Sequence, residues 1–128
     1  WKAAAHAEFK IGNTISSISA YEEASILGPD DKEIWLNWSF IYFEQGEHQK
    51  AIDVLLQGME EQPDEPEFFY RMTVYLIESG QFKEALNYLE NGLILDFEGH
   101  QVLFDFFPKL ETQKALQKII DQFRKDNP

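Results

Sequence analysis

The sequence predicts an all-α protein in which helical hairpins repeat side by side along the chain. Sliding the sequence against itself by 34 residues superposes landmarks of different residue types, which composition alone does not generate. The superposed pairs are Trp35 with Phe69, Gly46 with Gly80, Ala51 with Ala85, Leu55 with Leu89 and Gly58 with Gly92. Within each unit the apolar residues recur at helical spacing, and a glycine divides the unit into two helical stretches.

We expect a pair of helices in each unit, over residues 1–11 and 14–27, 31–45 and 48–61, and 65–79 and 82–95. The segments Asp30-Asp31-Lys32-Glu33 and Asp64-Glu65-Pro66-Glu67 mark two helix starts, at which an Asp caps and a Glu three residues later reaches back. Gly12, Gly46 and Gly80 end the first helices, where a left-handed residue closes the turn.

Small residues inside the second helices predict that a neighbouring helix approaches closely. These residues are Ala24, Gly58 and Gly92. A glycine inside a helix costs about 1 kcal/mol relative to alanine. Its presence twice at the same register therefore points to a packing requirement.

The last segment is a degenerate fourth unit with helices near 99–107 and 112–125. Lys114 stands where the turn glycine is expected, and Pro108 ends the first of these helices. The final helix has one dry stripe and one charged face, which suits a terminal cap. The stripe consists of Ala115, Leu116, Ile119, Ile120 and Phe123.

The landmarks resemble the tetratricopeptide repeat. The family pattern of aromatic, turn glycine, alanine, large residue, small residue and closing proline is matched by Trp35, Gly46, Ala51, Leu55, Gly58 and Pro63. The resemblance implies an α-α superhelix, a solenoid of about three hairpins plus the degenerate pair. We interpret 1–128 as a single domain with repeats at about 1–29, 30–63 and 64–97 and a cap at 98–128. Because Trp1 fills an aromatic position within a helix, we also expect the chain to be a fragment of a longer array.

Composition argues against several functional classes. The net charge of −12 repels phosphate backbones, so we expect no nucleic-acid partner. Without cysteine, neither disulfides nor thiolate metal sites can form, and His6, His48 and His100 lack the spacing of metal ligands. No apolar run is long enough for membrane insertion, and a cytoplasmic location is the default expectation. The motifs of nucleophilic catalysis and phosphate binding are missing, so we predict no enzyme, no cofactor and no metal.

The resemblance implies that the first helices line a concave groove for peptides or partner helices. Our groove candidates are Lys2, His6, Phe9, Asn37, Phe40, Phe43, Tyr70, Arg71 and Val74. Lys2, Asn37 and Arg71 look like members of the two-carboxylate clamp with which some cochaperones of this family hold the C-terminal Asp of a chaperone. His6 and Glu67 depart from that clamp, and an anion at Glu67 opposes a bound carboxylate.

The leading functional prediction is therefore a protein-interaction scaffold that binds a protein or peptide. The alternative is a structural terminal segment that caps a longer array or self-associates through the Phe-rich end. We interpret most of the aromatic residues as helix packing. Phe104, Phe106 and Phe107 either pack against the terminal helix or form a patch that meets a partner.

Overall fold

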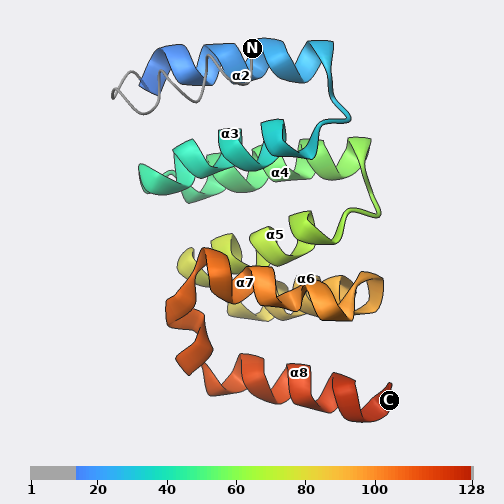
Figure 1. Cartoon of the computed structure of the whole chain (residues 1–128). Helices are drawn as coiled ribbons and strands as arrows, with labels where there is room; N and C mark the ends of the chain where they lie inside the picture. The colour runs from blue at the N-terminus through green and yellow to red at the C-terminus, as the bar shows by residue number, and fades with distance from the viewer. Residues whose placement is uncertain (1–13, 128) are drawn as a thin grey trace. The chain divides into compact units, whose positions relative to one another are not determined.

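The computed structural model describes residues 14–127, and the regular structure within them is entirely helical (Figure 1). The chain divides into two compact units, Trp1–Pro63 and Asp64–Pro128, which we call unit 1 and unit 2. The division falls at the predicted junction of the second and third repeats. The expected helix over 1–11 and the turn at Gly12 lie outside the described residues.

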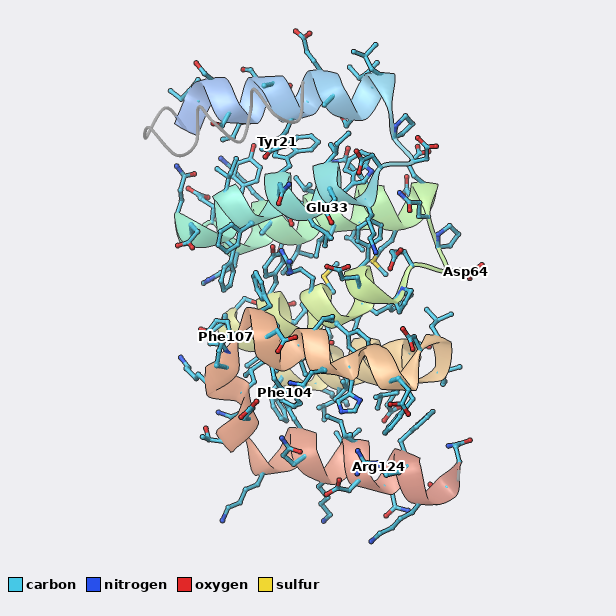
Figure 2. The ribbon with its side chains drawn as sticks, in the orientation of Figure 1. Tyr21, Glu33, Asp64, Phe104, Phe107 and Arg124 are labelled. Atoms are coloured by element: carbon cyan, nitrogen blue, oxygen red, sulfur yellow. The ribbon has the colours of Figure 1, made fainter. Side chains whose placement is uncertain are left out.

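Unit 1 contains three described helices, α2 (Thr14–Leu27), α3 (Lys32–Glu44) and α4 (His48–Glu61). The hairpin of α3 and α4 turns at Gly46, whose φ of 76° is in the left-handed region that glycine adopts without strain. α2 packs against α3, and Figure 2 shows Tyr21 of α2 lying between these two helices.

Unit 2 begins with the hairpin of α5 (Pro66–Glu78) and α6 (Phe82–Leu95), which turns at Gly80 with a φ of 81°. A 3₁₀ turn η1 (Phe97–His100), α7 (Gln101–Phe106), a second turn η2 (Pro108–Thr112) and α8 (Lys114–Asp126) complete the unit. Pro66 lies in the first turn of α5, where its missing N–H is no loss.

Two predictions of detail were wrong at the helix starts. The cap of α3 is Asp31, whose Oδ1 accepts from the Glu33 N–H at 3.0 Å, so Asp30 is outside the cap. The cap of α5 is Glu65, which accepts from the Glu67 N–H at 3.1 Å in place of Asp64. Both caps therefore lie one residue later than we expected.

The C-terminal segment is helical as predicted, but its first part is shorter and less regular. The expected helix 99–107 divides into the 3₁₀ turn η1 and the six-residue α7. Asp96 explains the turn, because its carboxylate accepts from the Gly99 N–H at 3.2 Å and holds the chain in a tighter coil. Pro108 ends α7 and begins η2, so α8 starts at Lys114 and not at 112. Leu116 and Ile120 bury the dry face of α8.

The small residues of the second helices do permit close approach, as predicted. A Cβ added to Gly58 would lie 2.8 Å from Cγ of Trp35, and one added to Gly92 would lie 2.9 Å from Cε1 of Tyr70. Each of these aromatic side chains also donates a hydrogen bond to a main-chain carbonyl oxygen. Trp35 Nε1 donates to the Pro29 carbonyl at 2.8 Å, and the Tyr70 hydroxyl donates to the Asp96 carbonyl at 2.6 Å. In both units, therefore, an aromatic side chain of the first helix packs directly on a glycine of the second helix and holds the two helices close together.

Candidate functional site

Three of the predicted groove residues lie together on α5. Tyr70, Arg71 and Val74 line one depression between α5 and α7, the first helices of two successive repeats in unit 2. The other residues of its lining are Glu67, Val102, Leu103 and Phe106. The free volume is about 10 Å³, which is the space of roughly one water molecule. A ligand at this place therefore lies over the depression and does not enter it.

Two aromatic side chains position Arg71 at the depression. Its guanidinium carbon is 3.7 Å from the centroid of the Phe106 ring, and its Nη1 donates to the Tyr75 hydroxyl at 3.4 Å. The Tyr75 ring meets Phe106 edge-on, with centroids 6.3 Å apart. Stacking occupies one face of the guanidinium, and the Arg71 side chain is half-buried. Because Glu67 lines the same depression, the site presents one cation beside one anion.

Tyr70 and Val74 form the buried floor of the depression. Tyr70 is 1% exposed and Val74 is fully buried, so neither presents surface to a ligand in this arrangement. Burial raises the pKa of the Tyr70 hydroxyl, and the negative charge of Asp96 raises it further. Tyr70 is buried because its ring packs directly on Gly92. The 34-residue register assigned that position to Phe69, which instead packs against Tyr88 with centroids 6.0 Å apart.

The candidates of unit 1 that the structure describes are Asn37, Phe40 and Phe43, all half-buried on α3. The rings of Phe40 and Phe43 are stacked with centroids 6.4 Å apart, and Phe43 meets His48 of α4 at 5.5 Å. Asn37 lies near the hydroxyl of Tyr21. Burial is the main cause that raises the pKa of Tyr21, Asn37 counteracts it, and the charge of Glu33 adds to the rise.

The remaining candidates, Lys2, His6 and Phe9, lie outside the described residues. Of the three clamp residues, Asn37 and Arg71 are therefore the ones that lie among the described residues. Within residues 14–127 no group of three His, Asp or Glu side chains is arranged to hold a metal ion. No helix in that range combines the length and the apolar content that crossing a membrane demands.

Sequence reasoning missed the role of Phe106. The sequence left two interpretations open for Phe104, Phe106 and Phe107, namely packing against the terminal helix or a patch that meets a partner. Phe104 is buried and its ring meets that of His100 edge-on, with centroids 6.3 Å apart, whereas Phe106 supports Arg71 on another helix, α5. Phe107 lies under the ammonium group of Lys109, which is 5.2 Å from the ring centroid. The repeat spacing does not predict the contact between Phe106 and Arg71. The direction of the Phe106 side chain depends on how α7 continues from the 3₁₀ turn η1.

The hairpin architecture is that of the tetratricopeptide-repeat fold, although no family model matches the chain. A structure of the MamA protein has 22% identity and a TM-score of 0.64, and the match covers 72% of this chain and 50% of that one. The Yersinia enterocolitica type III secretion chaperone SycD, in complex with a peptide of the translocator YopD, has 16% identity and a TM-score of 0.68, with coverage of 99% and 92%.

An O-GlcNAc transferase mutant from Thermobaculum terrenum has 23% identity and a TM-score of 0.58. That match covers 78% of this chain and 20% of the transferase, while the chain spans about half of the MamA protein. These structures contain tetratricopeptide repeats, and at such identities they establish the fold that this chain shares with them.

Proposed function

We propose that the chain is a protein-interaction module that binds a peptide or partner helix on the surface of its first helices. In unit 2 that surface is formed by α5 and α7, and in unit 1 by α3. The observation that carries the proposal is Arg71, a cation held by Phe106 and Tyr75 at the first-helix face and still partly accessible. A positioned arginine loses little side-chain entropy when it binds, because its rotamer is already fixed. One solved protein of the same fold, SycD, is seen with a peptide.

The first helices of the two units differ in their chemistry. In unit 2, the half-buried Arg71 and Glu67 place one positive and one negative charge at the depression, so we expect a peptide there to bind through charged and polar groups. The rings of Phe40 and Phe43 offer apolar surface on α3. A dedicated clamp for two carboxylates is the narrower version of the proposal, and Glu67 beside Arg71 works against it.

Selection from a random peptide library displayed on phage tests the proposal without a known partner. Selected peptides are synthesised with a fluorophore, and their dissociation constants are measured by fluorescence anisotropy against the wild type, Arg71→Ala and Lys118→Ala. Lys118 is an exposed cation on α8, so it controls for loss of charge. We expect Arg71→Ala to raise Kd by about fivefold or more, as for loss of a central arginine, with Lys118→Ala near the wild type. No saturable binder, or equal weakening by both variants, would contradict the proposal.

The clamp is tested with pairs of peptides that end in a free carboxylate or in an amide. If Arg71→Ala leaves the affinity of the free-carboxylate peptide unchanged, the clamp idea is dropped. The broader proposal survives that outcome only if the same substitution weakens another selected peptide.

A structural role is the second candidate, and one observation on α2 favours it. Ile15, Ile26 and Leu27 are 81%, 79% and 69% exposed, so this helix presents large apolar side chains to solvent. Such a surface suits contact with a further hairpin or a second copy of the chain. Light scattering over a range of concentrations separates the two candidates. A dimer that forms with rising concentration and dissociates in Ile26→Lys supports the structural role, whereas a monomer that binds peptide supports the scaffold.

A further inference from the structure

A second and much larger hollow lies between α6 and α8. Its volume is about 260 Å³, and it shares no residue with the depression between α5 and α7. Its lining residues are Glu90, Ile94, Ile119, Gln122, Phe123 and Asp126. An apolar cavity of about 150 Å³ already accommodates benzene, so this hollow has room for a large apolar side chain.

The floor of the hollow is apolar and partly open to solvent. The Ile94 side chain is 69% exposed, although contact of an apolar side chain with water is unfavourable. Ile119 and Phe123 contribute half-buried surface from α8. Covering these three side chains with an apolar group would remove their remaining apolar surface from water.

The rim of the hollow is acidic. Glu90 and Asp126 are the two charged residues of the lining, and both carry negative charge. Gln122 Nε2 donates to Asp126 Oδ1 at 3.0 Å and so positions that carboxylate. Asp126 also ends α8, where the helix dipole opposes a negative charge and favours a cation beside it.

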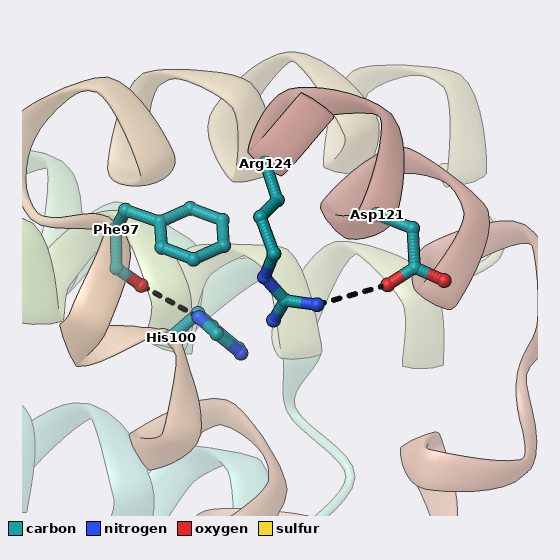
Figure 3. Close-up of polar contacts among 4 residues, drawn as sticks. All are labelled: Phe97, His100, Asp121 and Arg124. Carbon is teal, nitrogen blue, oxygen red and sulfur yellow. Dashed lines mark hydrogen bonds and ion pairs between the residues drawn. The ribbon is translucent and has the colours of Figure 1, made fainter. Parts of the chain in front are cut away.

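The nearest arginine of α8 is engaged elsewhere, as Figure 3 shows. The Arg124 guanidinium lies 3.4 Å from Asp121 and 5.3 Å from the centroid of Phe97. Phe97 in turn stacks on Phe123 with centroids 5.7 Å apart and an interplanar angle of 8°. His100 holds the turn that carries Phe97, since its Nδ1 and the Phe97 carbonyl oxygen are 2.6 Å apart. Phe123 is therefore a fixed wall of the hollow, and Arg124 does not neutralise the rim.

We propose that the hollow between α6 and α8 is a binding site for a basic peptide segment, with one large apolar side chain inserted against Ile94, Ile119 and Phe123. Lysine or arginine side chains on either side of the inserted residue pair with Glu90 and Asp126. Volume and apolar lining select the inserted side chain, and charge complementarity selects its neighbours. The site belongs to the second helices and is independent of the surface proposed for the first helices.

The test uses a short probe peptide, acetylated and amidated, with one central leucine flanked on each side by two lysines. A matched peptide has serine in place of the leucine and the same charge. Binding to the full chain is followed by NMR of isoleucine methyl groups labelled with ¹³C. Ile94 and Ile119 report the hollow, while Ile15 and Ile26 on α2 serve as exposed apolar controls in unit 1.

We expect the leucine peptide to shift the methyl signals of Ile94 and Ile119 saturably and to leave those of Ile15 and Ile26 unchanged. Ile94→Ser should raise Kd by about tenfold, because it removes an apolar wall. Neutralising both rim acids in Glu90→Gln/Asp126→Asn should raise Kd by about three- to tenfold, as for two exposed ion pairs. The control Glu84→Gln/Glu98→Gln removes two exposed acids outside the lining and should change Kd by less than about twofold.

Each contrary result overturns the site. No shift of Ile94 and Ile119 with the leucine peptide, or equal shifts at Ile15 and Ile26, excludes specific binding in the hollow. Equal affinity of the serine peptide excludes insertion of an apolar side chain. Equal weakening by the two double variants reduces the effect to general attraction by an acidic protein. All five substituted positions are exposed, and circular dichroism establishes that the variants remain folded.

Discussion

Gly58→Ala is the substitution whose effect the structure defines most closely. The added Cβ would lie 2.8 Å from Cγ and 2.9 Å from Cβ of Trp35. The Cβ of Trp35 is bonded to the main chain of α3, so the ring cannot avoid the contact by changing its rotamer alone. The indole is also held by its hydrogen bond to Pro29, and Trp35 is only 4% exposed. Relief of the contact therefore requires α3 and α4 to move apart.

Two opposing terms determine the size of the effect. Overpacking of a tight interior costs about 1–3 kcal/mol. Replacing glycine by alanine inside a helix returns up to about 1 kcal/mol through propensity. Because the clash involves a Cβ fixed to the main chain, the overpacking cost should lie in the upper part of its range, about 2–3 kcal/mol. After subtraction of the propensity gain, we expect Gly58→Ala to lower the free energy of unfolding by about 1–2 kcal/mol. Gly28 is the matched control, since a Cβ there has only the Ala24 carbonyl oxygen within 4 Å, at 3.9 Å. Gly28→Ala should leave stability unchanged or raise it by up to about 1 kcal/mol.

Urea unfolding followed by tryptophan fluorescence measures this effect in the relevant unit. Trp35 and Trp38 lie on α3 in unit 1, and residues 64–128 contain no tryptophan, so the fluorescence change reports unit 1 even if the two units unfold separately. Circular dichroism reports both units together. If Gly58→Ala is as stable as the wild type, or if Gly28→Ala loses as much, steric contact with Trp35 is not the reason for glycine at position 58.

Three further predictions concern the turn, the cap and a buried tyrosine. Gly46→Ala should cost about 1–2 kcal/mol in urea unfolding, because φ is 76° and a Cβ there meets nothing within 4 Å, so any loss comes from the main chain. Asp31→Ala should cost about 1 kcal/mol and Asp30→Ala less than half of that, since Asp31 alone caps α3. Tyr70→Phe should cost about 1–2 kcal/mol by leaving the Asp96 carbonyl without its 2.6 Å partner. The raised pKa of Tyr70 adds a pH dependence. The folded state keeps the phenol proton while the unfolded chain loses it near pH 10, so the wild type should lose stability above about pH 10 more steeply than Tyr70→Phe.

The repeat could be predicted from the sequence because its landmarks are imposed by the main chain. A turn that requires a left-handed residue selects glycine, and Gly46 and Gly80 have that conformation. A helix that must pass close to an aromatic ring also selects glycine, and Gly58 and Gly92 fill that position. These constraints are local and recur at a fixed interval, so one sequence suffices to reveal them.

The exact caps and the shape of the C-terminal segment could not be predicted in the same way. Asp30 and Asp31 are chemically alike, and the choice between them depends on where the chain becomes helical; Asp31 is still extended, with φ −91° and ψ 102°. The 3₁₀ turn η1 depends on one carboxylate, that of Asp96, accepting from a main-chain N–H three residues later. Several acids are compatible with such a role, and only the folded arrangement decides between them.

The packing of the candidate site residues on α5 could not be predicted from the repeat pattern. Arg71 lies on α5 and lines the depression between α5 and α7. In the first hairpin the ring that packs on the glycine is Trp35, and 34 residues later the equivalent position is Phe69. The ring that packs on Gly92 is instead Tyr70, one residue after that position. That shift turns a predicted contact residue into a core residue. A one-residue change in side-chain direction of this kind depends on packing between helices, which a repeat pattern does not encode.

The two hollows of unit 2 differ in volume and lining, so we expect different ligands to fit them. The space between α5 and α7, about 10 Å³, admits no side chain, so the peptide that we propose to bind there is expected to stay at the surface beside Arg71 and Glu67. The hollow between α6 and α8, about 260 Å³, admits a large side chain and offers three apolar residues to it. Interface energy concentrates where an anchor fills a desolvated pocket, and exposed charge pairs contribute less. A peptide bound only between α5 and α7 should therefore be selective for charge but weak, and strong affinity in unit 2 requires a ligand that reaches Ile94 and Phe123.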